Sequence, residues 1–396
     1  MKKLFWLFLS LLSACQWTQI SPQNQLNNAF ALQNSHIQKA LVGIYDQVQE
    51  IENQRLVLAE LQEQSLKNTN LSDLEKEILD KKVRTTNLLV ENFWKNSYKA
   101  IAQTNLVLEE SSQIKDSLRA NQTKGETLFL RAYLHFSLSQ FFASPDLAVP
   151  YVKNTELYPK RDSLLIFYKN IENDLQKALV LLKKEDFNKN YANFWAAKML
   201  LAKLYFVQKN YTACLAQSQD LLSSPFSLNL SPTNAFQNES EKEVIWQLAN
   251  TATDLSSQAI AAFYAKTFAN SPVFDVRDKR LAFLENNKIL KYQNAVGLPI
   301  FRFSELILLH AYALNQTQAD FREVRNYVNL VRTRANLAAN NAASSSERLN
   351  ELILDEYKKE LVWEGKVFAF FGKAYPLPIP QREMGLNPTL VQNSGY

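Results

Sequence analysis

Residues 194–211 read FWAAKMLLAKLYFVQKNY, and this stretch decides the fold. Apolar side chains recur three and four positions apart, as on the face of a helix that packs against a neighbour. The pattern continues to Leu222 and ends before Pro225, which cannot continue a helix. Large and small side chains alternate at the expected packing positions, namely Leu201, Ala202, Tyr205, Tyr211 and Cys214. The stretch therefore predicts a pair of packed helices.

The same patterning occurs twice more. Residues 125–136 are followed after a loop by residues 167–182, and residues 304–315 are followed by residues 321–335. Such pairs match the tetratricopeptide repeat, in which each pair buries its apolar face against the next one. The chain has 7 glycines in 396 residues, which argues against a sheet-rich fold. The sequence predicts a mostly α fold, a tetratricopeptide-like helical repeat scaffold with a loop-rich face and a few short strands.

Residues 226–300 interrupt the helical pattern. Prolines punctuate this part of the chain and its borders, at Pro225, Pro232, Pro272 and Pro299. Residues 243–248 read EVIWQL, which predicts a short strand. Loops on a rigid scaffold commonly carry binding residues, so we expect the ligand face here. The candidate ligand contacts are aromatic: Phe236, Trp246, Tyr264 and Tyr292, together with Trp94 from an earlier helix. Trp246 and Trp94 also fit core positions, because their neighbours are apolar or lie on a packed helix.

The N-terminus has the features of an export signal. Two lysines precede the apolar run of residues 4–12, which is too short to span a bilayer. Residues 12–15, Leu-Ser-Ala-Cys, resemble the lipobox of bacterial lipoproteins. We expect residues 1–14 to be a lipoprotein signal peptide and Cys15 to carry the lipid that anchors the chain to a membrane. Residues 15–30 are expected to form a flexible tether, and residues 31–396 a single helical domain.

The composition argues against several classes of function. The formal net charge is +5, and no basic stripe with interleaved aromatics occurs, so nucleic-acid binding is not expected. The histidines His36, His135 and His310 lie far apart, and the chain has no phosphate-binding loop or nucleophile elbow. We expect no enzyme activity, no cofactor and no metal. Cys214 is the one thiol left once Cys15 is acylated, and its neighbours predict a small buried helix residue.

Three acidic residues stand four positions apart near the C-terminus. Glu356, Glu360 and Glu364 would share one face of a helix, where like charges repel unless they have partners. Arg332 and Arg334, at the end of the preceding helix, are the expected partners. We therefore predict structural ion pairs rather than a catalytic acid and base.

Short blocks along nearly the whole chain resemble one family. They include residues 40–45 (ALVGIY), 94–105 (WKNSYKAIAQTN), 130–133 (LRAY), 275–277 (DVR), 301–306 (FRFSEL) and 331–335 (VRTRA). The last blocks are the most specific: residues 363–365 (WEG), 378–380 (PIP) and 392–396 (QNSGY). In this order they resemble the SusD/RagB-type nutrient-uptake outer-membrane lipoproteins of Bacteroidetes.

The resemblance implies a role at the cell surface. Such a protein would be lipid-anchored in the outer membrane and face the cell exterior, as a lid over a SusC-type TonB-dependent transporter. It would bind an oligosaccharide or oligopeptide without chemical change and present it to that transporter. The family is therefore expected to contain binders and not catalysts.

The chain departs from the family pattern in two places. After Glu364, the family carries an arginine and an aspartate where this sequence has Val367 and Phe370. Residues 46–92 contain no aromatic residue, so they cannot supply the aromatic platform on which the starch-binding member stacks sugars. The identity of the ligand, glycan or peptide, therefore stays open.

Two other functions fit parts of the sequence. A tetratricopeptide adaptor lipoprotein that organises envelope protein complexes would need the helical repeats alone. The C-terminal blocks and the long segment 226–300 favour the nutrient-binding function over this alternative. An envelope hydrolase would require a catalytic carboxylate, for which Glu360 is the candidate.

Overall fold

The computed structural model describes residues 34–63, 66–67, 70–154, 158–185, 187–237, 242–249, 255–265, 268–269, 274–286, 288–293, 297–366 and 375–396. The expected signal peptide, Cys15 and the tether up to residue 30 lie outside these ranges, as do Val367 and Phe370. None of the helices in the described ranges combines the length and the apolar character that a membrane span needs.

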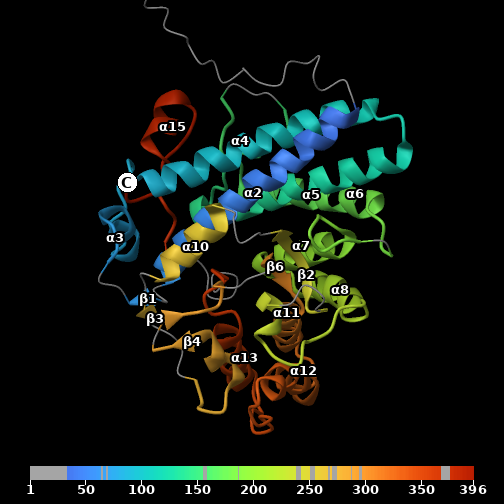
Figure 1. Ribbon diagram of the computed structural model, residues 1–396, viewed down its shortest axis with the longest axis vertical. Helices are drawn as coiled ribbons and strands as arrows, with labels where there is room; N and C mark the ends of the chain where they lie inside the picture. The colour runs from blue at the N-terminus through green and yellow to red at the C-terminus, as the bar shows by residue number, and fades with distance from the viewer. Residues whose placement is uncertain are drawn as a thin grey trace, which may run out of the picture.

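Helices account for most of the described chain (Figure 1). In chain order they are α2 (Asn34–Glu63), α3 (Asp73–Leu79), α4 (Leu88–Glu110), α5 (Ser117–Phe142), α6 (Leu164–Leu181), α7 (Phe194–Val207), α8 (Tyr211–Leu222), α9 (Asn234–Gln237), α10 (Leu255–Ala265), α11 (Phe303–Gln316), α12 (Phe321–Arg334), α13 (Ser346–Glu360) and α15 (Gln381–Leu386). Polar side chains begin several of them by accepting hydrogen bonds from the free backbone N–H groups of the first turn, as Asn87, Asp116 and Asn193 do.

The three helix pairs predicted from the sequence form. α5 packs against α6, α7 against α8, and α11 against α12. Successive pairs also touch, since α6 contacts α7 and α8 contacts α11 (Figure 1). Gly125 allows the first pair to approach closely, because a Cβ atom there would lie 2.8 Å from Cγ of Leu182. The mostly α, tetratricopeptide-like fold is therefore confirmed.

The N-terminal half forms a layer of long helices. α2, α4, α5 and α6 run side by side in Figure 1, and α10 lies along α2. The later helices α11, α12 and α13 pack together at the other end of the molecule. The segment from 226 to 300 therefore joins two helical regions.

Strands are few and short. The predicted strand is present as β2 (Val244–Ala249), which pairs antiparallel with β6 (Gly297–Arg302). Four further strands form a second small sheet in the order β1-β3-β5-β4, namely β1 (Leu66–Lys67), β3 (Phe268–Ala269), β5 (Lys288–Ile289) and β4 (Leu284–Glu285). This sheet joins residues just after α2 to the segment before β6.

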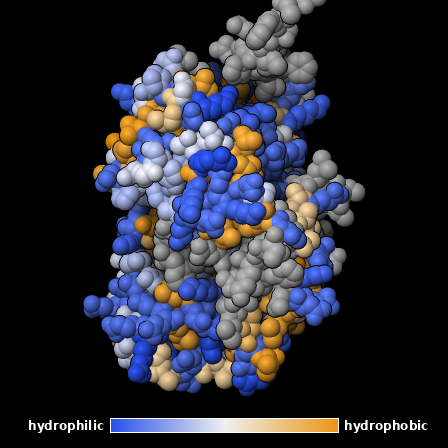
Figure 2. Space-filling view, turned by 90° about the vertical axis from the view of Figure 1, so that its left-hand side faces the viewer, coloured by the Kyte–Doolittle hydropathy of each residue, from blue (hydrophilic) through white to orange (hydrophobic). Residues whose placement is uncertain are grey.

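The C-terminal block holds distant parts of the chain together. The side-chain amide of Asn393 donates to the carbonyls of Phe142 and Leu377, at 2.9 and 2.7 Å. Arg161 donates to Oδ1 of Asn393 at 2.9 Å. The backbone N–H of Gln381, at the start of α15, donates to the carbonyl of Thr85. The last residues are therefore part of the fold, and the polar side chain of Asn393 in the QNSGY block bonds to two distant carbonyls. Figure 2 shows the adjoining face, on which hydrophilic and hydrophobic residues are interspersed.

Candidate functional site

The structure places the five aromatic candidates in the core. Trp94, Phe236, Trp246, Tyr264 and Tyr292 are 3%, 1%, 0%, 2% and 8% exposed. The ring of Trp246 packs edge-on against the ring of Phe129, and Tyr264 stacks on Tyr292. The five side chains are therefore core residues in this structure, and the expectation that they contact a ligand stays a prediction. Phe236 and Trp246 pack against other aromatic rings of the 226–301 segment, whereas Trp94 packs against Phe142 of α5.

The expected ion pairs form at the C-terminal helix. Nη1 of Arg332 lies 3.0 Å from Oε2 of Glu356, and Nη2 of Arg334 lies 2.6 Å from Oε1 of Glu360. Both glutamates are at most 2% exposed. Buried carboxylates of this kind need such partners, because an unpaired charge inside a protein is costly.

Glu364 does not continue the helix face that was predicted. α13 ends at Glu360, and the chain then turns through Trp363 and Gly365, which both have positive φ angles of about 60°. The turn nevertheless brings the Glu364 carboxylate back to the other two, since Arg302 contacts both Glu360 and Glu364. The prediction of a shared helix face is therefore corrected, whereas the three carboxylates do lie in one cluster.

This cluster is larger than the sequence indicated, and we call it the buried ion network. Its members, each within 4.0 Å of a partner, are the basic side chains Lys203, Arg280, Lys291, Arg302, Arg332, Arg334 and Lys366 and the acidic side chains Glu243, Asp278, Glu305, Glu356, Glu360 and Glu364. Arg302 and Glu305 lie in the FRFSEL block, which is the one signal in the sequence that pointed to them. Arg280 and Glu356 are 76 residues apart, and no local pattern relates them.

The buried ion network shifts the pKa values of its glutamates in opposite directions. Burial works to raise the pKa of Glu360, but the cations Arg334, Arg302 and Arg280 outweigh it and lower that pKa to about 2. Burial also works to raise the pKa of Glu364, but Arg302 and Lys291 outweigh it and lower that pKa well below its usual value. For Glu356, burial prevails over Arg280 and raises the pKa. Two of the three glutamates therefore stay ionised, which suits a structural role and not proton transfer.

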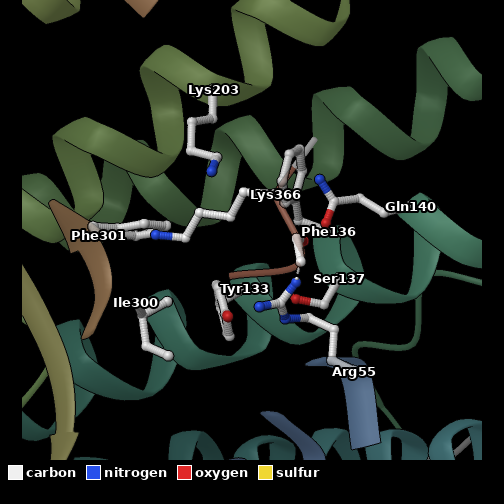
Figure 3. A pocket seen from close by; sticks show the side chains of 10 residues that line it. Arg55, Tyr133, Phe136, Ser137, Gln140, Lys203, Ile300, Phe301 and Lys366 are labelled. Atoms are coloured by element: carbon white, nitrogen blue, oxygen red, sulfur yellow. Dashed lines mark hydrogen bonds between the residues drawn. The ribbon is translucent and has the colours of Figure 1, made fainter. Parts of the chain in front are cut away.

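A small pocket adjoins the network (Figure 3). Lys203 of α7, Lys366 of the turn and Arg55 of α2 approach it from three elements, beside Tyr133 and Phe301. Its volume is about 20 Å³, which is room for about one water molecule. It cannot hold a sugar ring or an amino-acid side chain. Its cations serve the fold: Lys203 pairs with Glu305, and Arg55 donates to the carbonyl of Gly365 at 2.8 Å.

A much larger hollow lies along the N-terminal half of α5. We call it the amide groove, because carboxamides gather along it: Gln38 of α2, Asn121 and Gln122 of α5, and Asn188 and Asn193 of the loop before α7. Its volume is about 610 Å³, within the range of about 300–1,000 Å³ that small-ligand sites occupy. Arg119, Lys183, Phe187 and Tyr191 also line it.

Tyr191 presents an aromatic ring to this groove and is 44% exposed. The ring of Tyr45 supports it edge-on, with the centroids 5.3 Å apart. Tyr45 is itself held, because its hydroxyl donates to Oε2 of Glu126 at 2.6 Å and accepts from the N–H of Ala192 at 2.8 Å. Burial raises the pKa of Glu126, which lies under the groove. The exposed ring is therefore fixed in place before any ligand arrives.

Sequence reasoning missed the amide groove. Its carboxamides are ordinary helix and loop residues spread from position 38 to 193, and none stands in a recognisable motif. Within the described ranges, no group of three His, Cys, Asp or Glu side chains is placed to hold a metal ion. An aromatic ring beside hydrogen-bonding amides suits a ligand with apolar faces and polar edges.

Two family profiles and a related protein match this chain. A family profile described as starch-binding and associating with the outer membrane matches residues 16–206, and the SusD family profile matches residues 205–370. SusD-like protein P2 of Formosa agariphila is 22% identical over 416 residues, which cover 78% of this chain and 81% of that protein.

Solved structures share the fold. A SusD superfamily protein from Bacteroides vulgatus has a TM-score of 0.80 at 18% identity, over 93% of this chain and 100% of that chain. Another, from Bacteroides thetaiotaomicron, has a TM-score of 0.77 at 21% identity, over 91% and 99% of the two chains. The two profiles together span residues 16–370, and the likeness in structure extends over nearly the whole chain.

Proposed function

The chain belongs to the SusD/RagB family, and from this premise we propose that it is a cell-surface nutrient-binding lipoprotein. In this proposal Cys15 carries the lipid anchor in the outer membrane, and the protein passes its ligand to a SusC-type TonB-dependent transporter. The amide groove is the site that captures the ligand. The observation that carries the proposal is the exposed ring of Tyr191, held by Tyr45 in a groove of about 610 Å³.

The groove favours a saccharide over a peptide. A sugar ring has an apolar face that packs against an aromatic ring and a rim of hydroxyls that exchange hydrogen bonds with carboxamides. Tyr191 provides the ring, and Asn121, Gln122 and Asn188 provide amides along the groove. Leu118 and Val180, which are 64% and 86% exposed, contribute apolar surface at the same place.

Binding rather than catalysis also agrees with the state of the acidic residues. Glu360, the candidate for a hydrolase, is 2% exposed and is contacted by Arg302 and Arg334. Glu126 is the acidic residue in the lining of the groove, and both of its oxygens accept hydrogen bonds, from Tyr45 and Gln122. A glycosidase needs two carboxyl groups on either side of the scissile bond, and the described residues of this lining offer one.

The test is a binding measurement on the protein from residue 16 onward. Calorimetry against a panel of oligosaccharides and oligopeptides should give binding to saccharides that Tyr191→Ala reduces about fivefold to tenfold, since packing of a sugar on an aromatic ring contributes about 1–1.5 kcal/mol. Tyr158→Ala is the matched control, because Tyr158 is 46% exposed and lies outside the groove. Equal effects of the two variants, or binding of peptides alone, would contradict the proposed site.

The partner is tested separately. Affinity purification of the acylated protein from gently solubilised outer membrane should recover a TonB-dependent transporter in stoichiometric amount. Recovery of the lipoprotein with other envelope proteins and no transporter would instead support the adaptor function.

A further inference from the structure

Two basic side chains, Arg119 and Lys183, lie in the lining of the amide groove. Arg119 lies in the first turn of α5 and Lys183 lies two residues beyond the end of α6, and both side chains are exposed in the groove lining. Within the described residues neither has an ion-pair partner. Lys184, the next residue, is different, since it lies 3.7 Å from Asp220.

Among the described residues of the groove lining, Glu126 is the acidic side chain, and it does not balance these two cations. Glu126 is 7% exposed, and its oxygens accept hydrogen bonds from Tyr45 at 2.6 Å and from Gln122 at 2.8 Å. It therefore lies under the groove and is engaged by neutral donors. A ligand in the groove meets two exposed cations, one in α5 and one just after α6, and these two helices are packed against each other.

We propose that the amide groove binds an acidic saccharide, with a sugar ring against Tyr191 and a carboxylate between Arg119 and Lys183. This inference rests on the proposed function and adds the class of ligand to it. A guanidinium presents two parallel N–H groups that match a carboxylate, and an ammonium adds a compact second charge. Neutral sugars would leave both cations without a partner, so they are expected to bind more weakly.

The experiment compares acidic oligosaccharides with their own carboxyl-reduced forms. Oligomers of galacturonate, of mannuronate and guluronate, and of glucuronate-containing chains are each measured by calorimetry beside the reduced, neutral oligomer of the same linkage. At least one acidic oligomer should bind tenfold or more tightly than its reduced form. The preference should fall as salt is raised from 50 to 500 mM, because exposed charges are screened.

Variants assign the preference to the two cations. The double substitution Arg119→Gln with Lys183→Gln should lower the affinity for the acidic oligomer about tenfold, to that of the reduced one, so that the preference is lost. Lys184→Gln is the control, since this lysine is a neighbour that is already paired. Thermal unfolding of each variant shows whether the fold is intact, and exposed positions of this kind are expected to have little effect on it.

The results distinguish a failure of this inference from a failure of the proposed function. Saccharide binding that depends on Tyr191 but shows no preference for any acidic oligomer would overturn the acidic class and leave the nutrient-binding site in place. A preference that survives in the double variant would also overturn it. Absence of any saccharide binding would contradict the proposed site itself.

Discussion

Arg302 and Glu364 form a bidentate ion pair inside the protein. Nη2 of the arginine lies 2.6 Å from Oε1 of the glutamate, and Nε lies 3.1 Å from Oε2. Arg302 ends β6 and Glu364 lies in the turn after α13, so the pair joins the segment that precedes α11 to the last long helix. Charges taken out of water in this way are tolerated because each has a partner with good geometry.

Removing this arginine should therefore be costly. Arg302→Met leaves Glu364, Glu360 and Glu243 without their shared partner, and we expect the free energy of unfolding to fall by about 3–5 kcal/mol. Urea unfolding followed by circular dichroism measures the change. The matched control is Arg277→Met, because Arg277 pairs with Asp275 at 2.9 Å while 65% of its side chain is exposed. The free energy of unfolding of that variant should equal that of the parent protein. Similar losses of this free energy in both variants would contradict a special role for the buried ion network.

Gly365 is a second sensitive position. Its φ is +59°, and a Cβ atom there would lie 2.7 Å from Cβ of Ala59 in α2. Gly365→Ala should lower the free energy of unfolding by about 1–3 kcal/mol, through the left-handed backbone and the close contact. Gly385→Ala provides the comparison, since nothing lies within 4 Å of a Cβ atom at that residue of α15. The unfolding midpoint temperature of Gly385→Ala should equal that of the parent protein or rise slightly. A loss of stability equal to that of Gly365→Ala would refute the steric explanation.

Acid should destabilise the protein in part through His135. This side chain is fully buried, and Nε2 accepts a hydrogen bond from the N–H of Val152, so the ring is neutral. Burial lowers its pKa from 6.5 to about 3. Between pH 6.5 and 3 the unfolded chain binds a proton at this site and the folded chain does not, so stability is lost as pH falls through that window. His135→Gln should show a shallower fall of midpoint temperature between pH 7 and 4. A slope identical to that of the parent protein would argue against this assignment.

Cys214 should be unreactive in the folded protein. It is 0% exposed in α8, as its apolar surroundings in the sequence predicted, and burial raises the pKa of its thiol to about 12. A protein that starts at residue 16 has no other thiol, so labelling with a disulfide reagent at pH 8 reports on this residue alone. We expect reaction within minutes in 6 M guanidinium and none over the same time without denaturant. Rapid labelling under native conditions would show that α8 opens readily.

The helix pairs were predictable because their signal is local. Apolar spacing within residues 194–222 specifies one helix face without reference to the rest of the chain, and α7 and α8 follow that prediction. The pairing of Glu356 with Arg332 was predictable for a similar reason, since two consecutive helices of a repeat stack face to face. Glu364 was misplaced because its position depends on a turn with positive φ at Trp363 and Gly365, which the carboxylate spacing did not indicate.

The aromatic residues between 226 and 300 show the limit of such reasoning. Phe236 and Tyr292 have polar neighbours in the sequence, yet their rings pack edge-on 5.5 Å apart in the core. Whether an aromatic ring is buried depends on what the rest of the chain places against it, and neighbours in sequence carry little of that information.

The sequence alone determined the helical repeats, the family resemblance and the expectation of a lipid at Cys15, because periodicity and short motifs are local properties. Tertiary structure alone decided the shape and lining of the amide groove, to which we assign the ligand. Gln38, Glu126 and Tyr191 come from α2, α5 and the loop before α7, and only the packing of these helices gathers them around one groove. The buried ion network has the same origin, since Arg302 meets Glu364 only after β6 and the turn beyond α13 have been brought together.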